Sequence, residues 1–282
     1  MVLSMKLLRI LCTVLILFST AYSNKETKKC EEIMVHDQPH RKYVLSMGLN
    51  RPYQLAFDKH HHKLFFSHNV GSDEEDAFEI GYIEKDEMLP KVVHSVKNGF
   101  AIAIDNKGGI IYYGGSNGIY KENLKEKNAT VYEVLKDHNV WDMFFKHTLY
   151  FITYPLQHLY KLNAKNDVEH QKHIHEKIYQ FVIDGNEDVF ITNETGLFLI
   201  KNGTEERIPY KGPSVFRAIE INNKGIAYFC SKNGIYIANK TNHTLDMIAR
   251  IKHIFGIAFD NDDNIIYSDS HEIVKLLPEK CK

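Results

Sequence analysis

A segment of about 40 residues recurs along the chain, and this repeat restricts the fold more than any other feature of the sequence. Residues 100–120, FAIAIDNKGGIIYYGGSNGIY, match residues 216–236, FRAIEINNKGIAYFCSKNGIY, and both end in Asn-Gly-Ile-Tyr. Four further copies have the same shape, and the six copies begin at Tyr53, Phe100, Val140, Tyr179, Phe216 and Phe255. Such repeats stack on their neighbours, because one unit alone cannot bury its apolar face.

Each copy has the pattern of four strands. An apolar strand ends in Asp or Asn, a polar turn leads to a second apolar strand, and a turn rich in Gly, Asn and Ser leads to a third. An alternating segment with one polar face then follows. We therefore expect an all-β, six-bladed β-propeller with four-stranded blades, formed by residues 24–282 as a single domain. Independent hairpins are the alternative, but isolated hairpins are marginally stable.

Residues 1–23 have the pattern of a cleaved secretory signal peptide. Lys6 and Arg9 precede the short apolar run ILCTVLILF, and small residues follow at positions 21 and 23. A membrane anchor is the alternative, but the run is too short to span a bilayer comfortably. We therefore expect a secreted, extracellular glycoprotein, whose Asn-x-Thr sequons begin at Asn128, Asn193, Asn202, Asn239 and Asn242.

The two ends of the mature chain complement each other. The sixth copy stops at Pro278 before a fourth strand, whereas residues 41–48, RKYVLSMG, have the pattern of such a strand. We predict that this N-terminal strand completes the last blade and closes the ring, which removes an exposed sheet edge. Closure would bring Cys30 near Cys281, and we predict a disulfide between them. Cys230 lies in an apolar strand and is predicted to be a buried free thiol.

The charge balance gives no reason to expect nucleic acid or an anionic membrane as a partner. The chain has 35 basic and 36 acidic residues and a formal charge of −1. No phosphate-binding loop, G-x-S-x-G or Cys-x-x-Cys motif is found in the sequence. We expect a monomer without a cofactor.

The segments that enter each copy carry the candidate ligand-binding residues. In a propeller these segments gather around the central channel on one face. Every copy has an aromatic residue there, and a few copies add cationic or amide groups. The candidates are Arg51, Tyr53, Asn98, Phe100, Asn139, Trp141, Tyr179, Phe216, Arg217 and Phe255. This set suits a flat, conjugated, partly anionic small molecule. The alternative is that the aromatic residues fill the channel or pack between blades.

A divalent-metal-dependent lactonase is an alternative function for a six-bladed propeller. Hard cations need several oxygen ligands, and the entry segments offer few beyond Asn98, Asn139 and Asp142. We therefore expect neither a metal site nor enzyme activity. The Asp or Asn that ends a first strand faces the opposite loops and is predicted to accept backbone N–H bonds in a turn. His173 and His175 are predicted to share a face of an outer strand and to remain solvated.

The repeat motifs, taken in order, resemble those of the ommochrome-binding proteins of insect haemolymph. The resemblance rests on PYQLAFD (52–58), LFFSHN (64–69), VKNGFAIAID (96–105), YYGGSNGIYK (112–121), FVID (181–184) and FGIAFDNDDNIIYSDS (255–270), and it covers nearly the whole mature chain. It implies a secreted carrier of ommochrome pigments, which are tryptophan-derived phenoxazinones, or of their precursors.

Under this resemblance the planar pigment would stack on the aromatic candidates, namely Tyr53, Trp141, Tyr179 or Phe216. Its carboxylates would pair with Arg51 or Arg217, because the planar guanidinium fork of Arg binds a carboxylate at two points. An extracellular propeller that recognises a protein partner without a small ligand is a further alternative.

Overall fold

The computed structural model describes residues 30–72, 75–85, 87–127 and 129–281. Residues Glu32–Cys281 form one compact unit, whose architecture follows. The predicted signal peptide and the sequon at Asn128 lie outside the described residues. Cys30 and Cys281 are disulfide-bonded and Cys230 is a buried free cysteine, so both predictions about the cysteines are confirmed.

The described residues contain strands and no helix, and four of the sheets have four antiparallel strands each. The first sheet consists of β3 (Tyr53–Asp58), β4 (Lys63–Asn69), β5 (Phe78–Ile83) and β6 (Lys91–Val92). The second consists of β7 (Ala101–Asp105), β8 (Ile110–Gly115), β9 (Gly118–Asn123) and β10 (Tyr132–Lys136). The third consists of β11 (Val140–Lys146), β12 (Thr148–Thr153), β13 (Leu159–Leu162) and β14 (Val168–His170). The fourth consists of β15 (Gln180–Ile183), β16 (Val189–Asn193), β17 (Gly196–Ile200) and β18 (Arg207–Pro209).

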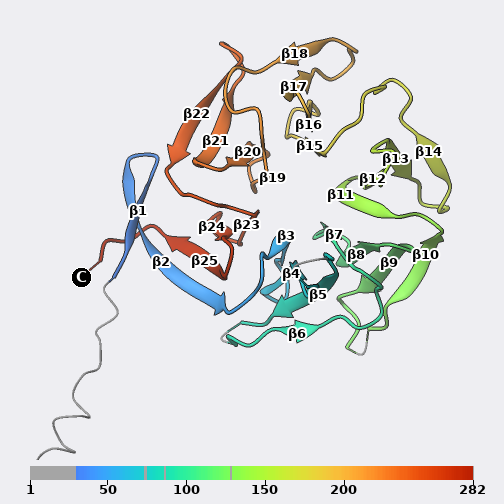
Figure 1. Cartoon of the computed structure of the whole chain (residues 1–282), viewed down its shortest axis with the longest axis horizontal. Coiled ribbons are helices and arrows are strands. Elements are labelled where there is room, and N and C mark those ends of the chain that lie inside the picture. Colours follow the sequence, from blue (N-terminus) through green and yellow to red (C-terminus); the bar gives the residue numbers. More distant parts are fainter. Residues whose placement is uncertain (1–29, 73–74, 86, 128, 282) are drawn as a thin grey trace, which may run out of the picture. The chain divides into compact units, whose positions relative to one another are not determined.

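A nine-stranded sheet contains both ends of the described chain. Its order is β19-β20-β21-β22-β1-β2-β25-β24-β23. The strands are β1 (Glu32–Val35), β2 (Gln38–Met47), β19 (Ala218–Ile221), β20 (Ala227–Ser231), β21 (Gly234–Asn239), β22 (Thr244–Ala249), β23 (Gly256–Phe259), β24 (Ile265–Ser268) and β25 (Glu272–Leu277). β2 pairs antiparallel with β25, with Arg41 opposite Leu277. The N-terminal segment therefore lies beside the last strand of the sixth copy, blue beside red in Figure 1.

The first strand of each copy lies innermost, and the sheets are arranged around these strands (Figure 1). Each innermost strand contacts the next: β3 with β7, β7 with β11, β11 with β15, β15 with β19, β19 with β23, and β23 with β3. The ring of innermost strands therefore closes on itself. Where β23 meets β3, position 256 requires a glycine, because a Cβ there would come within 2.8 Å of the Leu55 side chain.

The hydrophobic core lies between neighbouring sheets. One cluster joins Phe65 and Ile80 of the first sheet to Ile111 and Tyr113 of the second, and equivalent clusters join the other neighbours. Tyr113 is fully buried, and its hydroxyl donates a 2.7 Å hydrogen bond to Glu122. β-Branched and aromatic side chains form these strands because they pack well on a pleated surface.

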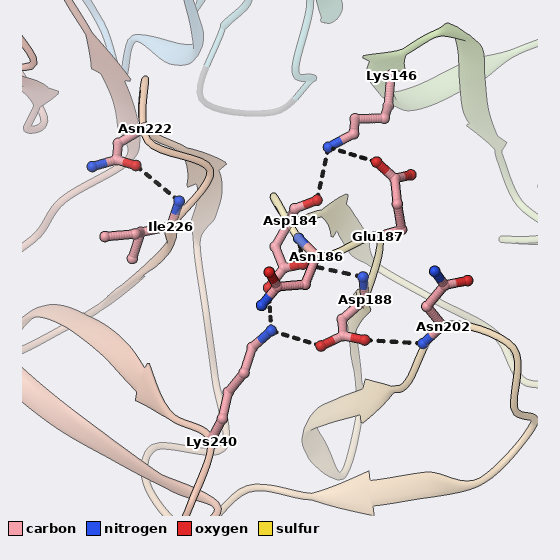
Figure 2. Close-up of polar contacts among 9 residues, drawn as sticks. All are labelled: Lys146, Asp184, Asn186, Glu187, Asp188, Asn202, Asn222, Ile226 and Lys240. Atoms are coloured by element: carbon pink, nitrogen blue, oxygen red, sulfur yellow. Dashed lines mark hydrogen bonds and ion pairs between the residues drawn. The ribbon is translucent and has the colours of Figure 1, made fainter.

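The Asp or Asn that follows or ends a first strand accepts backbone hydrogen bonds in the turn, as predicted. Asp184 Oδ1 accepts from the backbone N–H groups of Asn186 and Asp188 at 2.8 and 3.1 Å (Figure 2). The side chain of Asn222 accepts in the same way from Lys224 and Ile226. Equivalent bonds are made by Asp58, Asp105 and Asp260. These residues are therefore part of the turn structure.

Lysine side chains join the fourth turn to its neighbours. Lys240 Nζ lies between the carboxylates of Asp184 and Asp188, 2.6 Å from Asp188 Oδ2 (Figure 2). Lys146 stands where the other copies have Asp or Asn, and its Nζ donates to the Asp184 carbonyl at 2.7 Å. The third copy therefore supplies a cation to the turn of the fourth copy.

Replacing Lys240 with methionine should lower the free energy of unfolding by about 1–2 kcal/mol, because the Asp184 and Asp188 carboxylates would lose their shared cation. The loss is no larger because the Lys240 side chain is 34% exposed, so solvent screens its charge. Urea unfolding at neutral pH measures the change. Lys172→Met, at an exposed residue, is the matched control, and equal stability of the two variants would contradict the prediction.

The prediction that His173 and His175 lie on an outer strand is wrong. The fourth strand of the third sheet is Val168–His170, and His173 and His175 follow it in turns and irregular backbone. The strand ends at His170 because β13, its pairing partner, begins at Leu159, with Tyr160 opposite His170.

Candidate functional site

A cavity of about 460 Å³ lies at the entry ends of the innermost strands. Residues from all six copies line it, among them Tyr53, Phe100, Trp141, Tyr179, Arg217 and Phe255. These six residues are called the collar. The backbone N–H groups of Phe100, Tyr179, Arg217 and Phe255 all bond to the neighbouring second strand, at Gly114, Thr192, Cys230 and Ser268. The collar therefore consists of one equivalent position in successive copies.

The collar corrects the sequence alignment of the fifth copy by one residue. We predicted Phe216 as the aromatic residue of that copy, but the equivalent position holds Arg217, because Arg217 precedes Ala218, which pairs with Cys230. Phe216 also lines the cavity and packs edge-on against Phe229 with ring centroids 6.1 Å apart. The collar thus has five aromatic side chains and one guanidinium group.

Neighbouring collar residues contact one another around the cavity. The Phe100 and Trp141 rings are stacked with centroids 4.9 Å apart, and Tyr53 lies 5.5 Å from Phe100 and 5.1 Å from Phe255. The Trp141 indole donates to the Tyr179 carbonyl at 3.0 Å. The Arg217 guanidinium lies 4.6 Å from the centre of the Phe255 ring. These contacts hold aromatic faces and edges around the opening.

Polar side chains lie directly below the collar. Gln54 donates from its amide to Asp142 Oδ1 at 3.0 Å, and Gln180 donates to the Arg217 carbonyl at 2.9 Å. The Oε1 atom of Gln180 is buried and has no hydrogen-bond partner in the described part of the chain. Glu220 lies further inside and also lines a second cavity of about 220 Å³ that continues along the innermost strands. The channel therefore has a polar section beneath an aromatic opening.

Both carboxyl groups of this polar section are harder to ionise than usual. Burial raises the pKa of Asp142 to about 7, although the Gln54 amide favours its charged form. Burial also raises the pKa of Glu220 to about 7, opposed by a backbone N–H bond from Ile221 and by the charge of Lys59. Asp142 is 6% exposed, whereas Glu220 is half-buried with its open side toward the cavities. Near neutral pH, each group is poised to gain or lose a proton.

Three predicted ligand-binding residues do not line the cavity. Arg51 pairs with Asp76 at 2.8 Å, and Asn98 Oδ1 accepts from the Phe78 backbone N–H at 2.7 Å. Both therefore hold the acidic insertion that contains Asp76 and Phe78, two residues that do line the cavity. Asn139 is exposed, and its carbonyl accepts from the Tyr154 backbone at 2.8 Å.

Among the lining residues that sequence reasoning missed are Gln54, Asp76, Phe78, Gln180 and Glu220. Glu220 had a signal in the sequence. The strand register aligns it with Ala56, Ala103, Val182 and Ala258, so an acid stands where these copies have apolar residues. Asp76 and Phe78 had none, because the insertion that carries them occurs in one copy.

The described residues offer neither a metal-binding cluster nor a membrane-spanning helix. They contain no group of three or more His, Cys, Asp or Glu side chains arranged to hold a metal ion. Among the same residues no helix is long and apolar enough to cross a membrane.

Solved structures share this fold at low sequence identity. A gluconolactonase from Xanthomonas campestris is 10% identical with a TM-score of 0.66, and covers 88% of this chain and 95% of its own. A virginiamycin B lyase from Staphylococcus aureus is 13% identical with a TM-score of 0.56, over 88% and 99%. The WD40 β-propeller domain of Doa1 is 13% identical with a TM-score of 0.57, over 83% and 96%. The fold is therefore that of a β-propeller.

No family model matches the sequence. The ommochrome-binding protein of Manduca sexta is 30% identical over 256 residues, which are 88% of this chain and 92% of that protein. Identity at this level over nearly the full length of both proteins goes beyond a shared fold. The chain therefore belongs to the ommochrome-binding protein family.

Proposed function

We propose that this protein is a secreted carrier that binds an ommochrome-type phenoxazinone pigment, or a precursor of one, inside the collar. The observation that carries the proposal is a cavity of about 460 Å³ surrounded by five aromatic side chains and one arginine. A cavity of this size lies within the usual range for small-molecule sites. The relative from Manduca sexta, which is named for binding an ommochrome, supports the ligand class.

We further propose that residues 24–282 form one six-bladed domain. Four four-stranded sheets and the two four-stranded runs of the nine-stranded sheet would be the blades. The two runs are β19-β20-β21-β22 and β2-β25-β24-β23, and β2 supplies the fourth strand of the latter by pairing with β25. The ring of contacts among the six innermost strands supports a count of six blades. In this arrangement the collar takes one residue from each blade.

The collar would hold a flat pigment by stacking and by charge. Trp141 and Tyr179 offer rings at the opening, and Tyr179 is 38% exposed. No carboxylate among the described residues pairs with Arg217, so its guanidinium is available to an anionic ligand group. Arg51 is occupied by Asp76. Arg217 is therefore our choice for the pigment's carboxylate.

Titration with xanthommatin should quench the fluorescence of Trp141, which is the chain's single tryptophan. Quenching is expected because the indole lies in the collar, in contact range of any ligand in the cavity. Emission is measured at constant protein concentration, with free N-acetyltryptophanamide as the control for absorption by the pigment. Unchanged emission at a pigment concentration that saturates binding in equilibrium dialysis would remove Trp141 from the site.

A hydrolase is the second candidate. Asp142 and Glu220 are two carboxyls in one cavity with pKa values raised to about 7, which is a property of general acids and bases. The fold is also that of the gluconolactonase from Xanthomonas campestris. Assays of lactone hydrolysis with and without a chelator decide between the candidates. Turnover that Glu220→Gln abolishes would favour the hydrolase, and its absence alongside pigment binding would favour the carrier.

A further inference from the structure

The polar section of the cavity offers hydrogen-bond acceptors and uses its amide donors internally. The two glutamines of the lining donate to Asp142 and to the Arg217 carbonyl. Gln180 also lines the cavity, and its buried Oε1 has no hydrogen-bond partner among the described residues. Glu220 accepts one bond, from the Ile221 backbone at 2.8 Å, and no other hydrogen bond to it is found among the described residues. Asp142, Gln180 and Glu220 are called the acceptor set.

The acceptor set lies deeper in the channel than the collar's cation. Glu220 lies on β19, three residues after Arg217, which directly precedes that strand, and extended backbone places it about 10 Å further in at about 3.3 Å per residue. Glu220 also lines the second cavity, whereas Arg217 does not. The channel therefore has a positive group at its opening and carboxyl groups inside.

We propose that the acceptor set binds an ammonium or amine group of the ligand, so that the preferred ligand is a flat aromatic compound with N–H donors at its inner end and an anionic group at the collar. The inference rests on the proposed function, because it uses the same cavity, and it adds the chemical class that the inner end selects.

The selection follows from the cost of unpaired buried groups. An ammonium group would satisfy Gln180 Oε1 and the free oxygen of Glu220 with charge-assisted hydrogen bonds. A ligand carboxylate in the same place would meet two carboxyl groups, and the two glutamine amides of the lining already donate to other acceptors, which is unfavourable in a buried site. The charged groups closest to Glu220 along the two cavities are Asp142 and Lys146 on β11 and Lys59 after β3. Lys146 is engaged by the Asp184 carbonyl and Glu187, and no ion pair between Lys59 and Glu220 is found among the described residues.

Three probes that share one indole ring test the proposal: tryptamine, 3-ethylindole and indole-3-propionate. Calorimetry at pH 8 compares their affinities for the full mature protein. We expect tryptamine to bind at least about tenfold more tightly than 3-ethylindole, as charge-assisted hydrogen bonds predict. Glu220→Gln should reduce this preference to less than about threefold, because a neutral amide binds a cation more weakly. Glu206→Gln, at an exposed residue, is the matched control and should keep the preference.

The outcomes separate this inference from the proposed function. Equal binding of tryptamine and 3-ethylindole, no binding of tryptamine, or a preference that survives in Glu220→Gln would each overturn the inference. Asp142→Asn provides a second test if Glu220→Gln fails to fold. Xanthommatin titrated into the same preparation tests the carrier itself. If the protein binds pigment but shows no preference for the amine, the proposed carrier function is supported and the amine inference is wrong. If it prefers the amine but does not bind pigment, the amine inference is supported and the proposed pigment ligand is wrong.

Discussion

Replacing Arg217 with alanine should weaken xanthommatin binding about tenfold to a hundredfold, since a hydrogen bond to a charged group is worth about 1.5–3 kcal/mol. The arginine stands in the collar where the other copies have an aromatic residue, and its guanidinium is held 4.6 Å from the Phe255 ring. Placement against an aromatic face limits its motion, so little side-chain entropy would be lost on binding. Equilibrium dialysis with the purified variant gives the affinity.

Two further variants make the Arg217 prediction specific. Lys97→Ala removes an exposed cation of an entry segment that does not line the cavity, and should change the affinity less than about twofold, as expected for a distant surface charge. Arg217→Lys keeps the charge but loses the planar fork, so its affinity should fall between wild type and Arg217→Ala. Equal affinities of Arg217→Ala and Lys97→Ala would rule out a carboxylate contact at Arg217.

Replacing Glu220 with glutamine should stabilise the unliganded protein by about 2 kcal/mol at pH 8 and change little at pH 4.5. The folded-state pKa of Glu220 is about 7 against a model value of 4.5. Between these values the folded protein therefore holds the proton more often than the unfolded chain does. Stability then falls as pH rises through this window, because the folded state must bury the charge. Glutamine carries no such charge.

Chemical unfolding at pH 4.5, 6 and 8 measures this effect. About 2 kcal/mol corresponds to roughly 4–8 °C in melting temperature for a protein of this size. The exposed-site variant Glu206→Gln should follow the wild-type pH profile. If Glu220→Gln and wild type lose stability in parallel between pH 4.5 and 8, Glu220 does not carry the buried charge.

The sheets were predictable from the sequence because each copy repeats its strand and turn signals. Asp184 and Asn222 mark the ends of first strands, and the turns after them form the expected backbone hydrogen bonds. The register within a strand was less predictable. Phe216 and Arg217 are adjacent, and a strand turns successive side chains to opposite faces, so a shift of one residue exchanges their roles. The hydrogen bond from Arg217 to Cys230 decides between them.

The inner polar groups could not be predicted from single motifs. Gln54 and Asp142 belong to the first and third copies, and their contact depends on how innermost strands that are not direct neighbours are arranged in the ring. Asp76 reaches the cavity through an insertion held by Arg51 and Asn98, which we had predicted as ligand-binding residues. A repeat predicts what its copies share, whereas these residues are where the copies differ.

The pairing of β2 with β25 joins segments from the two ends of the described chain. Arg41 lies opposite Leu277, so this part of the sheet cannot form until residue 277 has been synthesised. The collar likewise takes residues from position 53 to position 255. Contacts this distant in sequence form slowly and late in folding. A chain truncated before residue 272 would therefore lack β25, the pairing partner of β2, and one truncated before residue 255 would also lack a collar residue, so the N-terminal strand and the cavity both depend on residues far along the sequence.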